Sequence, residues 1–476
     1  MANIPFNKTK IVATIGPASN SKEMLSKLIH AGADVFRLNF SHGAHEDHQK
    51  VINNIRELNE ELDTRVSMLL DLQGPKIRVN EVAKGVKLRK GHEFIISIDE
   101  MIGTEYKAST SYKDIVKDAH AGDRVLIDDG KLELVIKEIR DTEVVCEVIH
   151  GGKLKSRKGI NLPDTKVSAP SLTEKDKEDL MFGIENEVNW VALSFVRKAE
   201  DITDLRKIIE ASGKDIRIVA KIEKPEAIQN IDAIIEVTDA VMVARGDLGV
   251  EIALEEVPIE QKIIVEKCNL AGKPVIIATQ MMESMIDNPR PTRAETNDVA
   301  NAVFDGADAL MLSGETAVGD FPEDVIKTMV KTIASIEDRS ERIYFKHYLP
   351  NQESPLFHND SVILTASRLA KASKAKAITG MTQKGYTAFK LASHRPKAHI
   401  VIFSENKPFL NTLNLVWGVR GVYYDKSNST DETIDDINEI LKERNFVGKG
   451  DVFISTASMP IQAKGRTNMV KINIVE

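Results

Sequence analysis

The stretch from Ala240 to Glu251 joins an apolar run to a charged ending. Residues 241–243 are Val, Met and Val, a short run of the kind found in the buried strands of parallel sheets. The run stops at Arg245-Gly246-Asp247, where charged groups stand at the end of the strand. Burying such charges is costly unless a charged partner or ligand neutralises them. The stretch therefore predicts a polar site at the carboxyl end of a strand.

The segment that ends at Glu223 repeats this pattern. Lys221 and Glu223 are two residues apart, so on a strand their side chains point to the same side. Glu223 and Asp247, on neighbouring strand ends, would suit one hard divalent cation, and Lys221 beside them would receive a phosphate. The same three residues could instead form a structural salt-bridge cluster. Taken alone, these two segments leave both interpretations open.

Composition and charge narrow the class of protein. At 476 residues the chain is too long for a single core, and its 42% hydrophobic and 29% charged content is typical of a soluble, folded protein. The net charge of −8 argues against a nucleic-acid partner. No apolar run approaches the roughly 18 residues of a membrane span, and residues 1–10 lack a signal-peptide core. Cys146 and Cys268, far apart and alone, favour a reducing cytoplasm.

Eight segments share one pattern, an apolar run that closes on polar or charged residues. They cover residues 10–17, 34–43, 66–75, 189–197, 216–223, 240–247, 274–281 and 309–316. Helix-like stretches lie between most of them, for example residues 21–32, with a glycine stop. Strand alternating with helix eight times predicts a (β/α)₈ TIM barrel, whose polar strand ends meet at one face.

The spacing of these segments has one gap. Most successive strands begin about 23 to 35 residues apart, but the third and fourth are separated by more than about 120. The intervening residues 85–99, 123–140 and 142–150 are short and alternating, with glycine turns. They predict a small inserted antiparallel β domain. Such an insertion at the catalytic face would make a lid, although a passive insertion fits the pattern equally well.

The residues after the eighth strand predict a further domain. Residues 348–356 have the composition of a linker. Beyond it, residues 366–376 and 432–444 are helix-like, and residues 397–404 and 451–459 are strand-like. We therefore expect a carboxy-terminal α/β domain with its own sheet.

Eight motifs in order resemble those of the pyruvate kinase family over essentially the whole chain. They lie at residues 9–19, 37–43, 159–164, 220–223, 243–251, 278–285, 289–304 and 311–318. The resemblance implies a catalytic barrel, an inserted small β-barrel lid and a carboxy-terminal α/β regulatory domain. The corresponding boundaries are 1–73 with 170–344, 74–169, and 345–476. It also implies a homotetramer, and a cytoplasmic enzyme of glycolysis.

The resemblance further implies transfer of a phosphoryl group from phosphoenolpyruvate to ADP, giving pyruvate and ATP. Such chemistry demands positioning and charge neutralisation. By resemblance, Glu223 and Asp247 hold Mg²⁺ or Mn²⁺, and a second Mg²⁺ accompanies ADP. Lys221 and Arg37 meet the transferred phosphate. The backbone around Gly246 cradles the substrate carboxylate, where a larger side chain would intrude.

The resemblance also implies roles for other residues of these motifs. Thr279 would orient the water that protonates the enolate, since a hydroxyl is no free acid at neutral pH. Ser313 and Glu315 are expected in the same proton relay. Arg245 is expected to form a structural ion pair facing away from substrate. For the nucleotide, the resemblance implies Thr14, Asn39, His42 and Arg78, with Lys158 from the lid.

Two regions depart from the family pattern. Relatives that need K⁺ bind it at positions matching Asn39, Ser41 and Asp71 with a threonine next, where this chain has Leu72; an acidic residue is replaced by Lys76. We expect Lys76 to supply the missing charge, so that K⁺ is not required, unless Lys76 points to solvent.

The second departure is in the turn at residues 379–388, which matches an effector-phosphate site of allosteric relatives. Its candidate residues are Thr382, Lys384 and Thr387. Lys384-Gly385 stands where many relatives have Ser-Gly, which leaves open whether a sugar phosphate or nucleotide effector binds.

Two other functions fit parts of the sequence. A divalent-metal aldolase of the pyruvate-enolate type needs the metal carboxylates but neither the lid nor Lys158. A catalytically dead metabolite sensor is disfavoured, because Lys221, Glu223, Asp247 and Thr279 are all present.

Overall fold

The computed structural model describes residues 4–382, 384–426, 430–459 and 466–476. Eight parallel strands close into a barrel in the order β1-β16-β15-β14-β13-β12-β3-β2. They are β1 (Lys10–Ile15), β2 (Val35–Asn39), β3 (Ser67–Asp71), β12 (Trp190–Leu193), β13 (Arg217–Ile222), β14 (Ala240–Ala244), β15 (Val275–Ala278) and β16 (Ala309–Leu312). All eight predicted strand segments are thereby confirmed. Their side chains are almost all buried, as expected of strands covered by helices outside and packed side chains inside.

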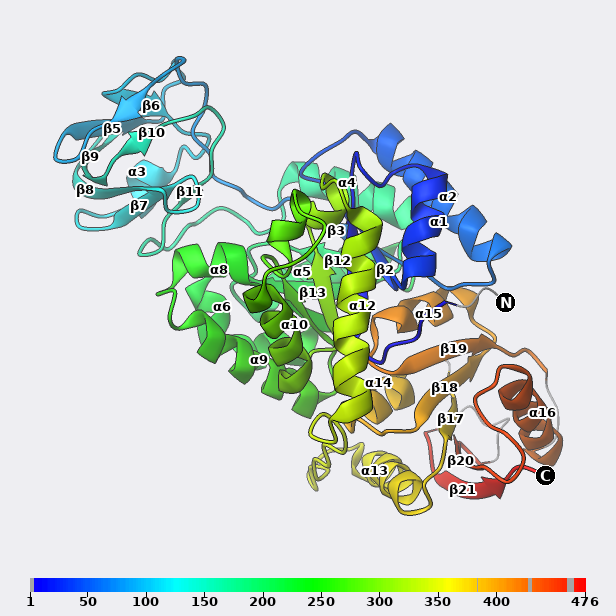
Figure 1. Cartoon of the computed structure of the whole chain (residues 1–476). Helices are drawn as coiled ribbons and strands as arrows, with labels where there is room; N and C mark the ends of the chain where they lie inside the picture. The colour runs from blue at the N-terminus through cyan, green and yellow to red at the C-terminus, as the bar shows by residue number, and fades with distance from the viewer. Residues whose placement is uncertain (1–3, 383, 427–429, 460–465) are drawn as a thin grey trace.

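Helices surround the barrel (Figure 1). They are α1 (Lys22–Ala31), α2 (His45–Glu61), α4 (Glu174–Glu185), α5 (Ala199–Ala211), α6 (Pro225–Gln229), α7 (Ile231–Val237), α8 (Arg245–Glu251), α9 (Val257–Ala271), α10 (Arg293–Asp305), α11 (Gly314–Ala317) and α12 (Pro322–Arg339), with the 3₁₀ helix η1 (Glu283–Ile286). Helix α1 has the capping residues that its sequence indicates. Ser21 accepts a hydrogen bond from the Met24 amide at the start of α1, and Gly32 ends it with φ 112°.

The insertion between β3 and β12 is a β domain of its own. It contains β4 (Lys87–Leu88), β5 (Glu93–Ser97), β6 (Lys107–Ser109), α3 (Ile115–Asp118), β7 (Arg124–Ile127), β8 (Leu132–Arg140), β9 (Glu143–His150), β10 (Gly152–Lys153) and β11 (Ile160–Asn161). Six strands form one sheet in the order β11-β7-β8-β9-β5-β6, and β5–β6 is a parallel pair. Bridges from Arg78 to Gly159 and from Val79 to Thr110 connect its two edges. The result is the expected small barrel-like lid, standing away from the main barrel in Figure 1.

The carboxy-terminal part has a separate five-stranded sheet in the order β19-β18-β17-β20-β21. Its elements are α13 (Phe357–Ala372), β17 (Ala377–Met381), α14 (Tyr386–Ser393), β18 (His399–Ser404), α15 (Lys407–Thr412), η2 (Leu413–Leu415), β19 (Val419–Tyr423), α16 (Thr430–Glu443), β20 (Val452–Ala457) and β21 (Met469–Ile474). The predicted α/β domain is therefore present. The sequence interpretation named only β18 and β20 as strands. It left out β17, β19 and the edge strand β21, which pairs antiparallel with β20.

The carboxy-terminal sheet packs against the amino ends of the barrel strands. Trp190, at the start of β12, donates its indole N–H to the Thr412 carbonyl at 3.2 Å. Lys10, at the start of β1, donates to the Val419 carbonyl at 3.3 Å. The lid leaves the barrel from the opposite, carboxyl end of β3. The two added domains therefore lie at opposite ends of the barrel, and only the lid adjoins the strand ends that carry the predicted site.

Candidate active site

A buried lysine is the centre of the polar cluster at the barrel mouth. Lys221 Nζ lies 2.9 Å from Glu223 Oε1 and 3.2 Å from Asp71 Oδ1, and it donates to Ser194 Oγ at 2.7 Å. Burial alone would lower the pKa of Lys221, but the charges of Asp71 and Glu223 outweigh it and raise that pKa. The ammonium form is therefore favoured, and it is held at the face where the strands end.

Arg37 completes the positive side of the cluster. Its Nε donates to Asp71 Oδ2 at 2.7 Å, and its Nη1 donates to Thr14 Oγ1 at 3.0 Å. Burial would raise the pKa of Asp71, yet the charges of Lys221 and Arg37 lower it overall. Asp71 is thus a fixed anion that orients two cations toward the mouth of the barrel.

Glu223 and Asp247 bring two carboxylates close enough at the strand mouth for their charges to interact. Glu223 is 1% exposed and accepts a hydrogen bond from the Phe195 amide at 2.7 Å. Its pKa is raised by burial and by the negative charge of Asp247, against the opposing effect of Lys221. Repulsion between two carboxylates at a strand mouth is what a bound cation relieves. One or two carboxylates plus substrate oxygens and water suffice for Mg²⁺, so the pair fits a divalent ion.

That pair is not a complete metal cage. Within the part of the chain that the structure describes, no three His, Cys, Asp or Glu side chains gather as a metal site. A cation held by Glu223 and Asp247 therefore needs ligands from substrate or water. This favours a metal that binds together with an anionic substrate.

Thr279 and Gly246 meet at the ends of β15 and β14. The Gly246 amide donates to Thr279 Oγ1 at 2.7 Å, and Thr279 Oγ1 donates to the Ala278 carbonyl at 2.6 Å. A Cβ on residue 246 would approach Thr279 Oγ1 to 3.3 Å, so the position favours glycine. Thr279 itself has φ 68°, a left-handed conformation that is uncommon for a β-branched residue. Such strain is typical of functional sites.

Arg245 forms a structural ion pair, as expected. It forms a bidentate pair with Asp298, with N–O distances of 2.8 and 2.7 Å, and also donates to the Thr279 carbonyl at 2.8 Å. Two parallel hydrogen bonds fix a guanidinium firmly. Arg245 therefore braces the backbone that carries Gly246 and Thr279.

The next strand end contributes a buried acid. The Glu315 carboxylate accepts from the Ser313 amide at 2.7 Å and from the Met282 amide at 3.1 Å. Burial raises the pKa of Glu315. These hydrogen bonds connect the Ser313–Glu315 segment to the loop that follows Thr279. The sequence predicted Ser313 and Glu315 as members of one proton relay with Thr279.

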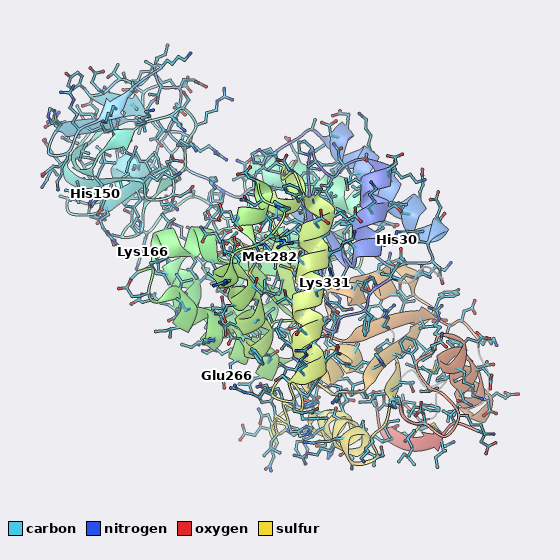
Figure 2. All side chains as sticks on the ribbon, in the orientation of Figure 1. His30, His150, Lys166, Glu266, Met282 and Lys331 are labelled. Carbon is cyan, nitrogen blue, oxygen red and sulfur yellow. The ribbon has the colours of Figure 1, made fainter. Side chains whose placement is uncertain are left out.

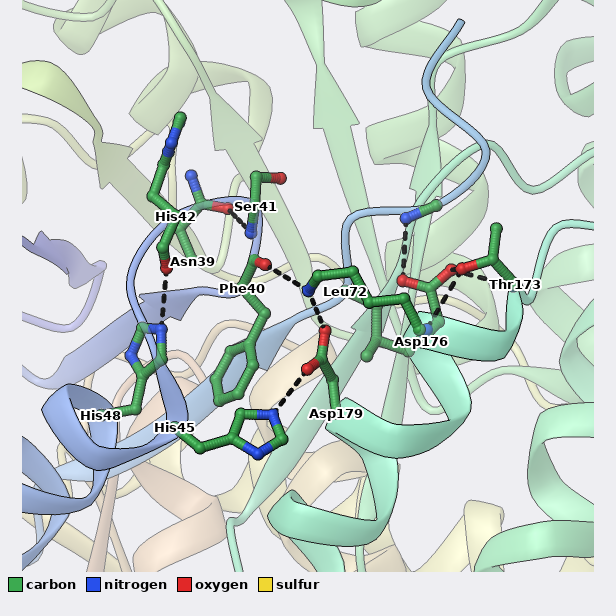
Figure 3. Close-up of polar contacts among 12 residues, drawn as sticks. Asn39, Phe40, Ser41, His42, His45, His48, Leu72, Thr173, Asp176 and Asp179 are labelled. Carbon is green, nitrogen blue, oxygen red and sulfur yellow. Dashed lines mark hydrogen bonds and ion pairs between the residues drawn. The ribbon is translucent and has the colours of Figure 1, made fainter. Parts of the chain in front are cut away.

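The loop after β2 carries three predicted residues and is fastened from two sides (Figure 3). Asn39 Oδ1 accepts from the Ser41 amide at 3.1 Å. The His42 carbonyl lies 2.9 Å from a ring nitrogen of His48 on α2. Both contacts fix the backbone of this loop, so its polar side chains are displayed in one arrangement.

The first turn of α4 anchors the same loop and the chain entering the lid. Lys175 Nζ donates to the Phe40 carbonyl at 2.9 Å. The fully buried Asp176 accepts from the Gly74 amide at 3.0 Å. One helix start therefore holds both loops beside the site (Figure 3).

The nucleotide candidates are only partly brought together. Thr14 belongs to the cluster because its hydroxyl accepts a hydrogen bond from Arg37. Arg78, by contrast, donates to the Arg157 carbonyl at 3.0 Å within the lid. Lys158 Nζ is 2.7 Å from Asp128 Oδ1, also in the lid, and this hydrogen bond lowers the pKa of Asp128. The side chains of Arg78 and Lys158 are thus both engaged by residues of the lid.

The effector candidates lie in the turn after β17 and in the first turn of α14, far along the chain from this site. Thr382 Oγ1 accepts from the Gly385 amide at 3.0 Å, and Lys384 is exposed. Thr387 is buried, with its hydroxyl 2.8 Å from that of Thr467. Gln383, within the predicted turn, lies outside the described residues.

Several contact residues were missed from the sequence. Ser194 and Phe195 directly follow β12 and contact Lys221 and Glu223, and Phe195 has φ 54°. Their segment was recognised as a strand, but nothing in its sequence marks the serine hydroxyl as a lysine partner. Polar residues directly after the strand were the only available signal.

The barrel with its charged mouth belongs to a class of phosphotransferases. The family model described as "Pyruvate kinase, barrel domain" matches residues 6–326, and "Pyruvate kinase, alpha/beta domain" matches residues 360–473. The chain belongs to the pyruvate kinase family, whose members generally need a divalent metal.

Individual relatives and a solved structure support the same family assignment. The chain is 45% identical to the pyruvate kinase of Clostridium perfringens (strain 13 / Type A), over 98% of this chain and 99% of the relative. It is 44% identical to that of Staphylococcus epidermidis (strain ATCC 12228 / FDA PCI 1200), covering 99% of this chain and 81% of the relative. A crystal structure of a pyruvate kinase from Cryptosporidium parvum superposes with a TM-score of 0.93 at 36% identity, covering 99% and 96% of the two chains.

Proposed function

We propose that the chain performs the family reaction at the Lys221 cluster, moving the phosphoryl group of phosphoenolpyruvate to ADP. The observation that carries this proposal is the buried Lys221 between Asp71 and Glu223, beside Arg37. Two fixed cations facing a strand mouth are preorganised for a phosphoryl group, and they need no rearrangement as charge moves. The purified chain is expected to release pyruvate only when ADP is present. Absence of ADP-dependent pyruvate release from phosphoenolpyruvate would favour a metal-dependent aldolase.

Each residue of the cluster has one proposed task. Lys221 and Arg37 bind and orient the phosphoryl group that is transferred. The amides around Gly246 and Asp247 hold the substrate carboxylate, once Gly246 exchanges its bond to Thr279 for the substrate. A divalent cation bound by Glu223 and Asp247, with Mg²⁺ or Mn²⁺ as the proposed ions, would neutralise substrate charge. A second Mg²⁺ is proposed to arrive with ADP.

The second half of the reaction is protonation of the enolate at C3. We propose that Thr279 orients the water that delivers this proton. Ser313 and Glu315 extend the relay, and the raised pKa of Glu315, caused by burial, suits it to hold a proton.

Thr279→Ala is expected to slow proton exchange at C3 of pyruvate by about a hundredfold, and phosphoryl transfer by much less. Alanine removes the hydroxyl but leaves the cations in place. Thr279→Ser is the control, because it restores the hydroxyl and with it the exchange rate. Equal losses in both half-reactions for Thr279→Ala would show that Thr279 serves general positioning.

Lys76 supports the proposal that K⁺ is not required. Its Nζ lies 3.8 Å from Asp247 Oδ1, and its side chain is 35% exposed. It therefore faces the site. Asp71, a predicted K⁺ ligand with Asn39 and Ser41, already lies against two cations, and Leu72 is buried. An ammonium about 4 Å from an anionic phosphate contributes on the order of 4 kcal/mol at an effective dielectric near 20, before desolvation.

Lys76→Glu is expected to weaken activity strongly, and added K⁺ should restore part of it. The wild type should be insensitive to K⁺ when assayed in tetramethylammonium buffer. Lys84→Glu, the same charge change at an exposed lid residue, is the matched control. Strong stimulation of the wild type by K⁺ would show that Lys76 does not replace the cation.

The remaining organisation is also proposed from the family. We place the domain boundaries at 73/74, 169/170 and 344/345, and expect a cytoplasmic homotetramer. No helix in the described ranges is long and apolar enough to cross a membrane. Thr382, Lys384 and Thr387 are the proposed effector-phosphate residues, and the effector would be a sugar phosphate or a nucleotide.

A further inference from the structure

Two chain segments join the lid to the barrel and pair with each other. Arg78 and Gly159 form an antiparallel bridge, the Val79 amide donates to the Lys158 carbonyl at 2.8 Å, and the Ile160 amide donates to the Ile77 carbonyl at 2.9 Å. We call residues 77–79 and 158–160 the hinge ladder. Figure 1 shows both segments crossing from the barrel to the lid. Arg78 and Lys158, the lid-side nucleotide candidates, both belong to this ladder, where Arg78 pairs with Gly159 and Lys158 bonds to Val79.

The residue that follows the hinge ladder is fastened to the barrel. Asn161 Nδ2 donates to Glu251 Oε1 at 2.8 Å, and Lys224 Nζ donates to the same oxygen at 2.8 Å. Asn161 ends β11 of the lid, Glu251 ends α8, and Lys224 lies two residues beyond β13. We call these three residues the hinge latch. In the hinge latch, the charged Glu251 carboxylate of the barrel accepts a hydrogen bond from the neutral Asn161 amide of the lid.

The hinge latch is buried, unlike an ordinary surface ion pair. The Glu251 side chain is 1% exposed and that of Lys224 is 11% exposed. Glu251 Oε2 is buried and has no hydrogen-bond partner among the described residues. Keeping such an oxygen unpaired is costly, and a merely structural ion pair would gain by satisfying it. A cavity of about 30 Å³ beside it is lined by Lys76 and Asp247 as well as by Glu251.

Two residues of the hinge latch lie close in the chain to the proposed metal ligands. Asp247 and Glu251 are four residues apart on α8, so they share one face of that helix. Lys224 directly follows Glu223 in the chain. The segment returning from the lid runs close to α8, as Lys166 marks in Figure 2. The groups that fix the lid and the groups that face the substrate are therefore carried by the same two segments.

We propose that Glu251 is a positioning residue for the nucleotide. Through Asn161 it holds the hinge ladder beside the barrel mouth, so that Arg78 and Lys158 stand where ADP must bind. This rests on the proposed nucleotide role of Arg78 and Lys158. Phosphoenolpyruvate is held by barrel residues and by Lys76, which precedes the hinge ladder, so its binding does not depend on the hinge latch.

The first test is Glu251→Gln, which keeps the side-chain shape and removes the charge. The KM for ADP is expected to rise about tenfold, a loss typical of a hydrogen bond to a charged group, while the KM for phosphoenolpyruvate stays within about twofold. Amide hydrogen exchange at Val79 and Ile160 should become faster. Glu255→Gln, the same change at an exposed residue nearby, should alter neither the KM for ADP nor the amide exchange at Val79 and Ile160.

The second test is Asn161→Ala, which leaves the buried Lys224–Glu251 pair intact and so avoids a folding defect. It should raise the KM for ADP and speed hinge exchange as Glu251→Gln does. The double variant should be no worse than the more affected single variant, because both act through one hydrogen bond. Additive effects, or unchanged hinge exchange in both single variants, would overturn the proposal.

Lys158→Ala separates this proposal from the one it rests on. A raised KM for ADP in Lys158→Ala, with unchanged KM in both hinge-latch variants, would overturn the role of Glu251 alone. An unchanged KM for ADP in Lys158→Ala would overturn the nucleotide assignment, and it would do so whatever the hinge exchange shows.

Discussion

Asp247→Asn is expected to lower kcat by about a hundredfold or more and to raise the divalent-metal concentration needed for activity. The amide keeps the shape but carries no charge, so it cannot balance a cation beside an anionic substrate. Asp247 is 32% exposed by its side chain and pairs only loosely with Lys76, at 3.8 Å. Its loss should therefore leave the fold intact, and the effect should be on catalysis.

Steady-state rates across a Mg²⁺ and Mn²⁺ titration measure this change. Asp232→Asn is the matched control, because Asp232 is 78% exposed and pairs with Lys267 on the outside of the barrel. Full activity of Asp247→Asn at ordinary metal concentration would contradict the metal assignment. So would full activity of the wild type in excess chelator.

Lys221→Met is expected to reduce phosphoryl transfer by about a thousandfold or more. The ammonium is most valuable when charge is moving in the transition state, so kcat should fall more than phosphoenolpyruvate binding. The substitution also leaves Asp71 and Glu223 buried without their shared partner, and a loss of about 3–5 kcal/mol in the free energy of unfolding is expected.

A second variant separates chemistry from folding. Lys221→Arg retains the charge, so it should fold and transfer the phosphoryl group faster than Lys221→Met, although a guanidinium is no exact replacement for an ammonium. Lys267→Met is the control at a half-buried lysine that pairs with Asp232 on the outside of the barrel. A folded Lys221→Met protein with near-normal transfer would remove Lys221 from the mechanism.

Much of the architecture was predictable because strand ends repeat a simple pattern. Each apolar run that closes on polar residues became a barrel strand, and the gap after residue 75 marked the lid. Glu223 and Asp247 were predictable as a pair for the same reason. Their strands, β13 and β14, are adjacent both in the chain and in the barrel.

Contacts that depend on closure of the barrel were harder to predict. Asp71 meets Lys221 because β3 pairs with β12 across the whole inserted lid, and β12 with β13. The turn conformation of Phe195, which aims its amide at Glu223, left no pattern in the sequence. The hinge latch was likewise hidden, because Asn161 and Glu251 are 90 residues apart and belong to different domains.

The position of the metal tests the account most directly. Crystals grown with Mn²⁺ and phosphoenolpyruvate can be measured for anomalous scattering from the ion. We predict a peak about 2 Å from carboxylate oxygens of both Glu223 and Asp247, with the substrate phosphate against Lys221 and Arg37. A substrate-bound Mn²⁺ that touches neither carboxylate would contradict the assignment of this cluster as the place of phosphoryl transfer.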